Sequence, residues 1–169
     1  MVLLKDYTVR GTVETFVMAP VRNPEILPSL IPLIIGAVVL ELYFGKYTRE
    51  SLGWNTALAN SMIWIATGAT LLMNGSGSSD AHLYGAAFLL VSGSFVAIMD
   101  FFHVWPEWIA FRVSSYGLIY LLAYIIVVMA KTGMEVNRTT LEGAGIFFFG
   151  SAALLHVVRW FEMPRDLAV

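Results

Sequence analysis

The chain has 169 residues, of which 58% are hydrophobic and 13% are charged, and its formal net charge at pH 7 is −2. This composition excludes an ordinary soluble domain, in which about half of the residues are apolar and about a quarter are charged. The balance of ten Lys and Arg against twelve Asp and Glu excludes the basic surface of a nucleic-acid-binding protein. Because the chain has no cysteine, disulfides, thiolate metal sites and cysteine catalysis are excluded as well.

The segment 1–24 is too charged to be a signal peptide and has no continuous apolar core. Its stretch VRGTVETFVM alternates loosely, which is compatible with a short strand or an interfacial segment, whereas the usual behaviour of chain ends favours a surface tail. We expect an N-terminal tail or interfacial segment over 1–24, a transmembrane domain over 25–163 and a short C-terminal tail over 164–169.

Five stretches are long and apolar enough to cross a bilayer, whose hydrocarbon core needs about 20 apolar residues of helix. The connections between them are short, so neighbouring helices should be antiparallel. The sequence therefore predicts an all-α fold, a polytopic integral membrane protein built as a compact bundle of about five transmembrane helices with short loops. The expected helices run over 26–44, 54–73, 81–103, 108–130 and 141–160.

Two of these helices are rich in small residues, which let membrane helices approach closely. The helix over 81–103 contains Gly93 and Ala97, and the helix over 141–160 opens with GAG and continues with GSAA. We expect these two helices at the crowded centre of the bundle.

Five crossings divide the loops between two membrane faces. The N-terminus shares face A with the loops 74–80 and 131–140, and face B holds the loops 45–53 and 104–107 together with the C-terminus. Five Lys and Arg fall on each face, so the positive-inside rule gives no orientation.

Most polar side chains of the predicted helices gather near face B. An ionisable group at membrane depth costs at least about 2.5–3.5 kcal/mol on insertion scales, so such residues usually pair or line a cavity. Tryptophans at the same level instead favour a shallow, interfacial position in which these residues cap helix ends. The cluster comprises Glu41, Asn60, Asp100, His103, Glu107, Arg112, His156, Arg159 and Glu162.

A metal site is one alternative use of this cluster. Asp100 and His103 are three residues apart and would share a helix face, and with His156 they offer the oxygen and nitrogen ligands of a transition metal. No H-E-x-x-H, Walker A or G-x-S-x-G motif occurs. We therefore expect a non-enzymatic protein without a cofactor, with a transition metal at Asp100, His103 and His156 as the alternative.

Three functions remain open on the sequence. The favoured one is an accessory or scaffold subunit of a larger membrane assembly, because no catalytic signature and no large soluble part is present. A small channel or transporter for small solutes or ions is the first alternative, and a metal-binding or redox membrane subunit is the second. The expected partners are the lipid bilayer and other membrane subunits, or further copies of the chain itself. The transport alternative would use a polar vestibule formed by Glu41, Asp100, His103, His156 and Arg159.

Overall fold

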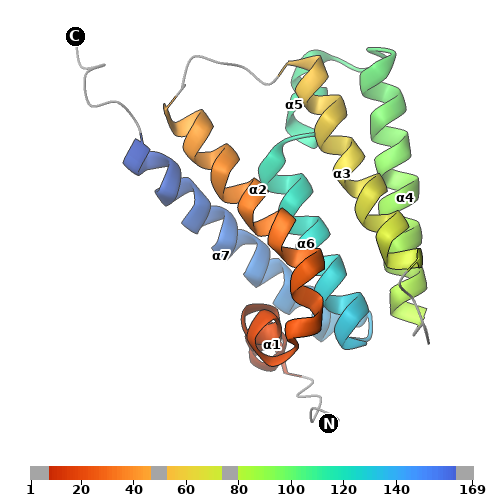
Figure 1. The fold of residues 1–169 in the computed structure, drawn as a ribbon, viewed down its shortest axis with the longest axis vertical. Coiled ribbons are helices and arrows are strands. Elements are labelled where there is room, and N and C mark those ends of the chain that lie inside the picture. The colour runs from red at the N-terminus through yellow and green to blue at the C-terminus, as the bar shows by residue number, and fades with distance from the viewer. Residues whose placement is uncertain (1–7, 47–52, 74–79, 163–169) are drawn as a thin grey trace.

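The computed structural model describes residues 8–46, 53–73 and 80–162, and these residues form an all-α bundle without strands (Figure 1). The predicted fold class is confirmed. The elements are α1 (Val9–Arg22), the 3-10 helix η1 (Pro24–Ile26), α2 (Leu27–Lys46), α3 (Trp54–Met73), α4 (Asp80–Phe101), α5 (Glu107–Val113), α6 (Tyr116–Thr132) and α7 (Arg138–Glu162).

The long helices run alternately up and down, as the short connections predicted (Figure 1). The lower end of the bundle in Figure 1, which carries the N-terminus, corresponds to face A, and the upper end corresponds to face B. Within the described residues, four stretches are long and apolar enough to cross a membrane. They are Trp54–Met73, His82–Phe101, Glu107–Thr132 and Arg138–Val158.

The segment before the bundle is a helix, so the strand alternative for it is wrong. Thr8 caps α1 by accepting a 3.0 Å hydrogen bond from the backbone N–H of Gly11. Phe16 and Ala19 are buried against the bundle, so this part of the chain is not a loose tail. α1 lies across the face-A ends of the long helices, against α6 and α7 (Figure 1).

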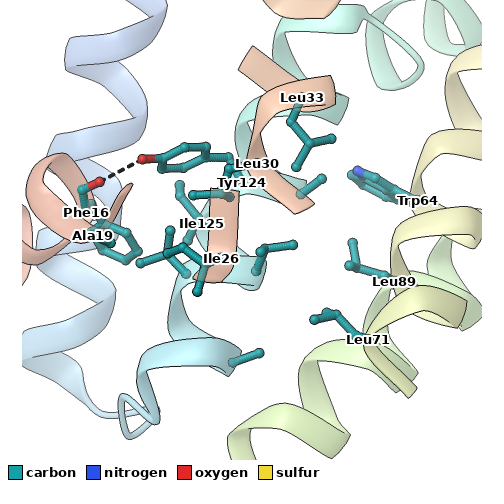
Figure 2. Close-up of a cluster of buried hydrophobic side chains, with 14 of the residues drawn as sticks. Phe16, Ala19, Ile26, Leu30, Leu33, Trp64, Leu71, Leu89, Tyr124 and Ile125 are labelled. Atoms are coloured by element: carbon teal, nitrogen blue, oxygen red, sulfur yellow. Dashed lines mark hydrogen bonds between the residues drawn. The ribbon is translucent and has the colours of Figure 1, made fainter. Parts of the chain in front are cut away.

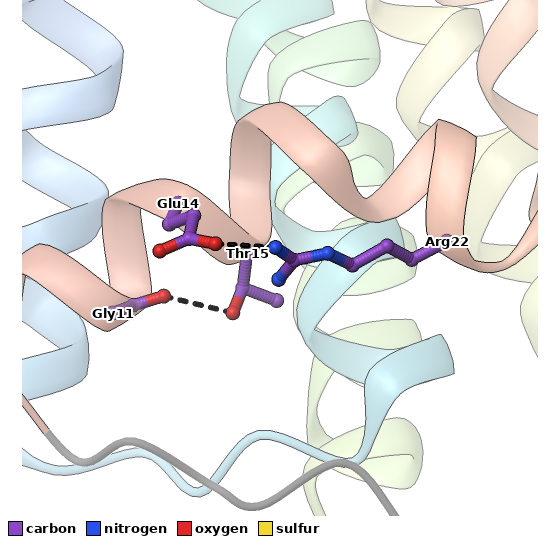
Figure 3. A network of polar contacts seen from close by, with 4 residues as sticks. All are labelled: Gly11, Glu14, Thr15 and Arg22. Carbon is purple, nitrogen blue, oxygen red and sulfur yellow. Dashed lines mark hydrogen bonds and ion pairs between the residues drawn. The ribbon is translucent and has the colours of Figure 1, made fainter. Parts of the chain in front are cut away.

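α1 carries two local polar contacts of its own, beside the exposed Val17 and Val21 (Figure 3). Arg22 forms an ion pair with Glu14, and the hydroxyl of Thr15 donates a 2.8 Å hydrogen bond to the carbonyl oxygen of Gly11. Both members of the ion pair are about half exposed, so the pair contributes at most about 1 kcal/mol to stability. α1 is therefore held mainly by its buried apolar face.

The predicted fourth helix is not continuous. It is divided into α5 and α6 at Ser114 and Ser115, where the backbone of Ser115 is extended with φ −61° and ψ 136°. Serine readily leaves the helical conformation because its hydroxyl competes for backbone hydrogen bonds. The break lies seven residues inside the candidate span, about 10 Å along the helix axis from Glu107.

α6 is the centre of the bundle, which corrects the expectation for the two glycine-rich helices. It contacts α2 and α7 on one side and α3 and α4 on the other, and its residues Ile119, Ala123, Val127 and Val128 have no exposed surface. Figure 2 shows the hydrophobic core around α6, to which α1, α2, α3 and α4 contribute side chains. By contrast, only 17% of the candidate span in α7 is buried, against 53% of the span that contains α6.

α3 and α4 share the most extensive contact between two helices of the described residues, and glycine makes their approach possible. A Cβ atom on Gly68 would lie 2.9 Å from the carbonyl oxygen of Ala86, and one on Gly93 would lie 2.9 Å from Cβ of Trp64. Where the two helices meet at face A, Nε2 of His82 lies 2.7 Å from the carbonyl oxygen of Leu71. The small residues of α4 thus serve its packing on α3.

Candidate functional site

Asp100 is the more deeply buried of the two ionisable residues that the structure describes as buried in the predicted face-B cluster, the other being Glu41. It lies in the last turn of α4, and only 1% of it is exposed. Its Oδ1 accepts a 2.8 Å hydrogen bond from the indole N–H of Trp105, and its Oδ2 accepts a 2.6 Å hydrogen bond from the hydroxyl of Ser114. Both oxygens are thus satisfied by neutral donors, and they tie the end of α4 to the break between α5 and α6.

The break itself is paired from α3. The side-chain amide of Asn60 donates a 2.9 Å hydrogen bond to the backbone carbonyl of Ser114, and both residues are buried. One turn further along α3, the indole N–H of Trp64 donates to the carbonyl of Ile119 at 2.8 Å. Because an unpaired buried carbonyl is costly, these side chains are what make an interrupted helix tolerable at this depth.

His103 lies next to this network, but its side chain does not take part in these hydrogen bonds. α4 ends at Phe101, so His103 lies beyond the helix. It therefore does not share a helix face with Asp100, as it would if the helix continued. It is exposed, has a left-handed backbone conformation with φ 52°, and its ring lies 4.2 Å from that of Trp54 between centroids.

The remaining members of the predicted cluster are dispersed. Glu107 and Arg112 are exposed on α5, and Glu41 is buried on α2. His156 is exposed on α7, which lies on the opposite side of the bundle from α4 (Figure 1). The side chains of Arg159 and Glu162 lie outside the described residues.

The predicted metal ligands are therefore not brought together. Asp100 is enclosed by its two donors, His103 is at the surface, and His156 is across the bundle. Among the residues described, no group of three His, Asp or Glu side chains could hold a metal ion. What the structure assembles at face B is a polar network around a helix break.

A groove that the polar residues did not indicate lies between α2 and α3, with α6 behind them. It has a volume of about 400 Å³, and its lining is mainly apolar. α2 contributes Pro28, Ser29 and Leu33, and α6 contributes Tyr120 and Val127. α3 contributes Ile63, Ala66, Thr67, Thr70 and Leu71. The signal for the groove in the sequence is the run of small and hydroxyl-bearing side chains on one side of 54–73.

A second surface that sequence reasoning missed is the outer face of α7. Its exposed residues recur every three or four positions, which places them on one side of the helix. Nothing lies within 4 Å of where a Cβ atom would stand on Gly145 or Gly150. The exposed residues include Ile146, Phe149, Gly150, Ala153, His156 and Val157.

Comparisons with known proteins assign none of these features. What the protein does is therefore inferred from the network, the groove and the outer face of α7. No family model matches the chain, and no curated protein or solved structure matches it either.

Proposed function

We propose that the protein is a non-enzymatic integral membrane protein that acts as an accessory or scaffold subunit of a larger membrane assembly. The membrane location is supported by four stretches with the length and composition of transmembrane helices. The observation that carries the subunit role is the outer face of α7, on which a histidine stands among small and apolar residues.

His156 is the ionisable residue on this face. It lies two residues before Val158, about 3 Å along the helix axis from the face-B end of the candidate span. Histidine within a transmembrane helix almost always faces a bundle interior or a water-filled cavity, because lipid cannot hydrogen-bond to it. A helix of another subunit with a hydrogen-bonding side chain at this level would remove that cost.

The shape of the face also suits a helix. Gly150 and Ala153 lie on the same side as His156 and carry little or no side chain, so a second backbone can approach closely. Interhelical packing and hydrogen bonds, rather than the hydrophobic effect, are what join helices inside a bilayer. We therefore assign the partner as a transmembrane helix of a different membrane protein that packs along α7.

The chain contains no cysteine, so a single introduced one can carry a cross-linker. Ala153→Cys places a benzophenone maleimide on the outer face of α7, and Ala87→Cys, on the exposed side of α4, is the matched control. In the native membrane, irradiation of the α7 variant should give an adduct with one distinct protein, and the control should not.

Two other outcomes would overturn this assignment. An adduct only at twice the mass of the chain would mean that α7 packs on a second copy. No protein adduct from either position would mean that the outer face of α7 meets only lipid.

One observation favours transport as a second candidate. The helix break at Ser114 and Ser115 lies inside a candidate span and directly beside the buried carboxylate of Asp100. Interrupted helices that expose backbone groups near the bilayer midplane recur at the binding sites of secondary transporters. Proteoliposomes should then conduct protons or monovalent cations, Asp100→Asn should abolish the flux, and the exposed-site control Glu107→Gln should keep it. Absence of flux with the parent protein would eliminate this candidate.

A further inference from the structure

We propose that the groove between α2 and α3 binds the hydrocarbon chain of a membrane lipid from the leaflet on face A. The proposal shares only the membrane location with the proposed function, because none of the residues that line the groove belongs to α7. A negative result in the test of one proposal therefore does not affect the other.

The volume and the lining of the groove identify the class of ligand. About 400 Å³ lies within the range of small-molecule sites, which are mostly apolar and contain few polar groups. Four of the groove's ten lining residues, Ser29, Thr67, Thr70 and Tyr120, carry a hydroxyl group, and that of Thr70 donates a 2.8 Å hydrogen bond to the carbonyl of Ala66 within α3. Such a mainly apolar surface suits a ligand that is a hydrocarbon chain.

Water is a weaker candidate for this space, because an ordered water needs two to four polar partners and most of the lining is apolar, with hydroxyls only on Ser29, Thr67, Thr70 and Tyr120. Because Pro28, Ala66 and Thr70 are exposed, the groove is open to the medium that surrounds the protein at its level. Two of the three helices that form its walls, α3 and α6, lie within candidate membrane spans. At that depth the surrounding medium is itself hydrocarbon, so lipid chains are the available occupant.

The placement of the lining residues gives the ligand a direction. Pro28 and Ser29 lie in the first turn of α2, and Thr70 and Leu71 lie in the last turn of α3, so this end of the groove is level with face A. From Leu71 the groove follows α3 to Ile63, about 12 Å deeper along the helix axis. A chain that enters here keeps its headgroup at face A.

The groove also has an open side through which a chain can enter. Pro28, Ala66 and Thr70 all line it and are exposed at the surface. The small side chain of Ala66 leaves this opening, and a tryptophan at the same position would occupy it. Ala66→Trp is therefore the variant that removes the site without touching the bundle core.

The test is lipid retention by the purified full-length protein, measured by native mass spectrometry with 1-palmitoyl-2-oleoyl-phosphatidylglycerol added to detergent micelles. The parent should retain one lipid under activation that strips the others. Ala66→Trp should lower the retained fraction about tenfold or more, because the added ring overpacks the occupied groove. Ala87→Trp, on the exposed side of α4, is the matched control and should behave as the parent.

Thr70→Phe fills the same opening from the next turn and replaces Ala66→Trp if that variant does not fold. A second measurement needs only the parent protein. A ligand that binds only the folded state raises the melting temperature, so the melting temperature of the parent should rise with the lipid concentration. No retained lipid on the parent, no rise in its melting temperature, or equal retention by parent and groove-filling variants would each overturn the proposal.

Discussion

The hydroxyl of Tyr124 on α6 donates a 2.8 Å hydrogen bond to the carbonyl oxygen of Phe16 on α1 (Figure 2). In an uninterrupted helix this carbonyl would accept from the backbone N–H four residues later. Residue 20 is proline, which lies inside α1 and has no N–H to donate. Tyr124 therefore supplies the hydrogen bond that α1 cannot make for itself, and the same bond holds α1 on the bundle.

Removal of that hydroxyl should loosen α1 in particular. Tyr124→Phe leaves the buried carbonyl of Phe16 without a donor, at a cost of roughly 1–3 kcal/mol. Hydrogen exchange of the amides in α1 should accelerate, and exchange in α3 and α4 should not. Tyr120→Phe is the control, because the Tyr120 hydroxyl makes no hydrogen bond to the described residues. Equal acceleration in both variants would contradict the assigned role.

A second substitution should compensate for the first. Pro20→Ala restores a backbone N–H that can bond to the carbonyl of Phe16, so Tyr124→Phe should then matter less. We expect the two substitutions to couple by about 0.5 kcal/mol or more, the range found for residues that share a partner. Thermal unfolding of the parent, both single variants and the double variant measures this coupling. Strict additivity would show that Tyr124 and Pro20 act independently on α1.

The transmembrane-length helices could be predicted because run length and hydropathy are local properties of a sequence. α1 was missed although Thr12, Phe16 and Ala19 are spaced for one helix face, because the segment is short and Pro20 interrupts it. The interruption at Ser114 was missed for another reason. Serine is common inside helices, and the break is accompanied by a hydrogen bond from Asn60 and one to Asp100, which lie 54 and 14 residues away in the sequence.

The glycines of the α3–α4 pair should tolerate no added methyl group. Gly68→Ala would place a Cβ atom 2.9 Å from a backbone oxygen of Ala86, which cannot move without shifting α4. We expect it to lower the free energy of unfolding by roughly 1–3 kcal/mol through overpacking.

Gly145→Ala provides the matched control, since nothing lies within 4 Å of the new methyl group. It should leave stability unchanged or raise it by up to about 1 kcal/mol, because alanine favours the helical state. Denaturation in mixed micelles compares the two variants. Equal stability of both variants would mean that α3 and α4 are farther apart than described.

The candidate sites were predictable to different degrees. Asp100 was identifiable because a carboxylate inside an apolar segment is rare and therefore conspicuous. The expectation that Asp100 and His103 share a helix face was wrong, because α4 ends at Phe101, two residues before the predicted end at His103. The groove was missed because it exists only where small side chains from α2 and α3 fail to meet, and a single sequence does not say which helices face each other.

The network around Asp100 should behave as one unit. Asp100→Ala leaves the hydroxyl of Ser114 and the indole N–H of Trp105 without an acceptor, at a cost of roughly 2 kcal/mol or more. Ser114→Ala removes one donor from a buried carboxylate and should cost roughly 1–3 kcal/mol. Since both variants lose the same 2.6 Å hydrogen bond, the double variant should be more stable than additivity predicts, by about 0.5–3 kcal/mol.

Ser115→Ala is the internal control for this cycle, because Ser115 lies at the same break and its side chain makes no capping hydrogen bond. Its effect should stay within about 0.5 kcal/mol of the parent. If Ser115→Ala were as destabilising as Ser114→Ala, the break would depend on serine as a residue type and not on the hydrogen bond to Asp100. If neither Ser114→Ala nor Ser115→Ala changed the stability, the hydrogen bond to Asp100 would have no structural role, and this result would favour the transport candidate.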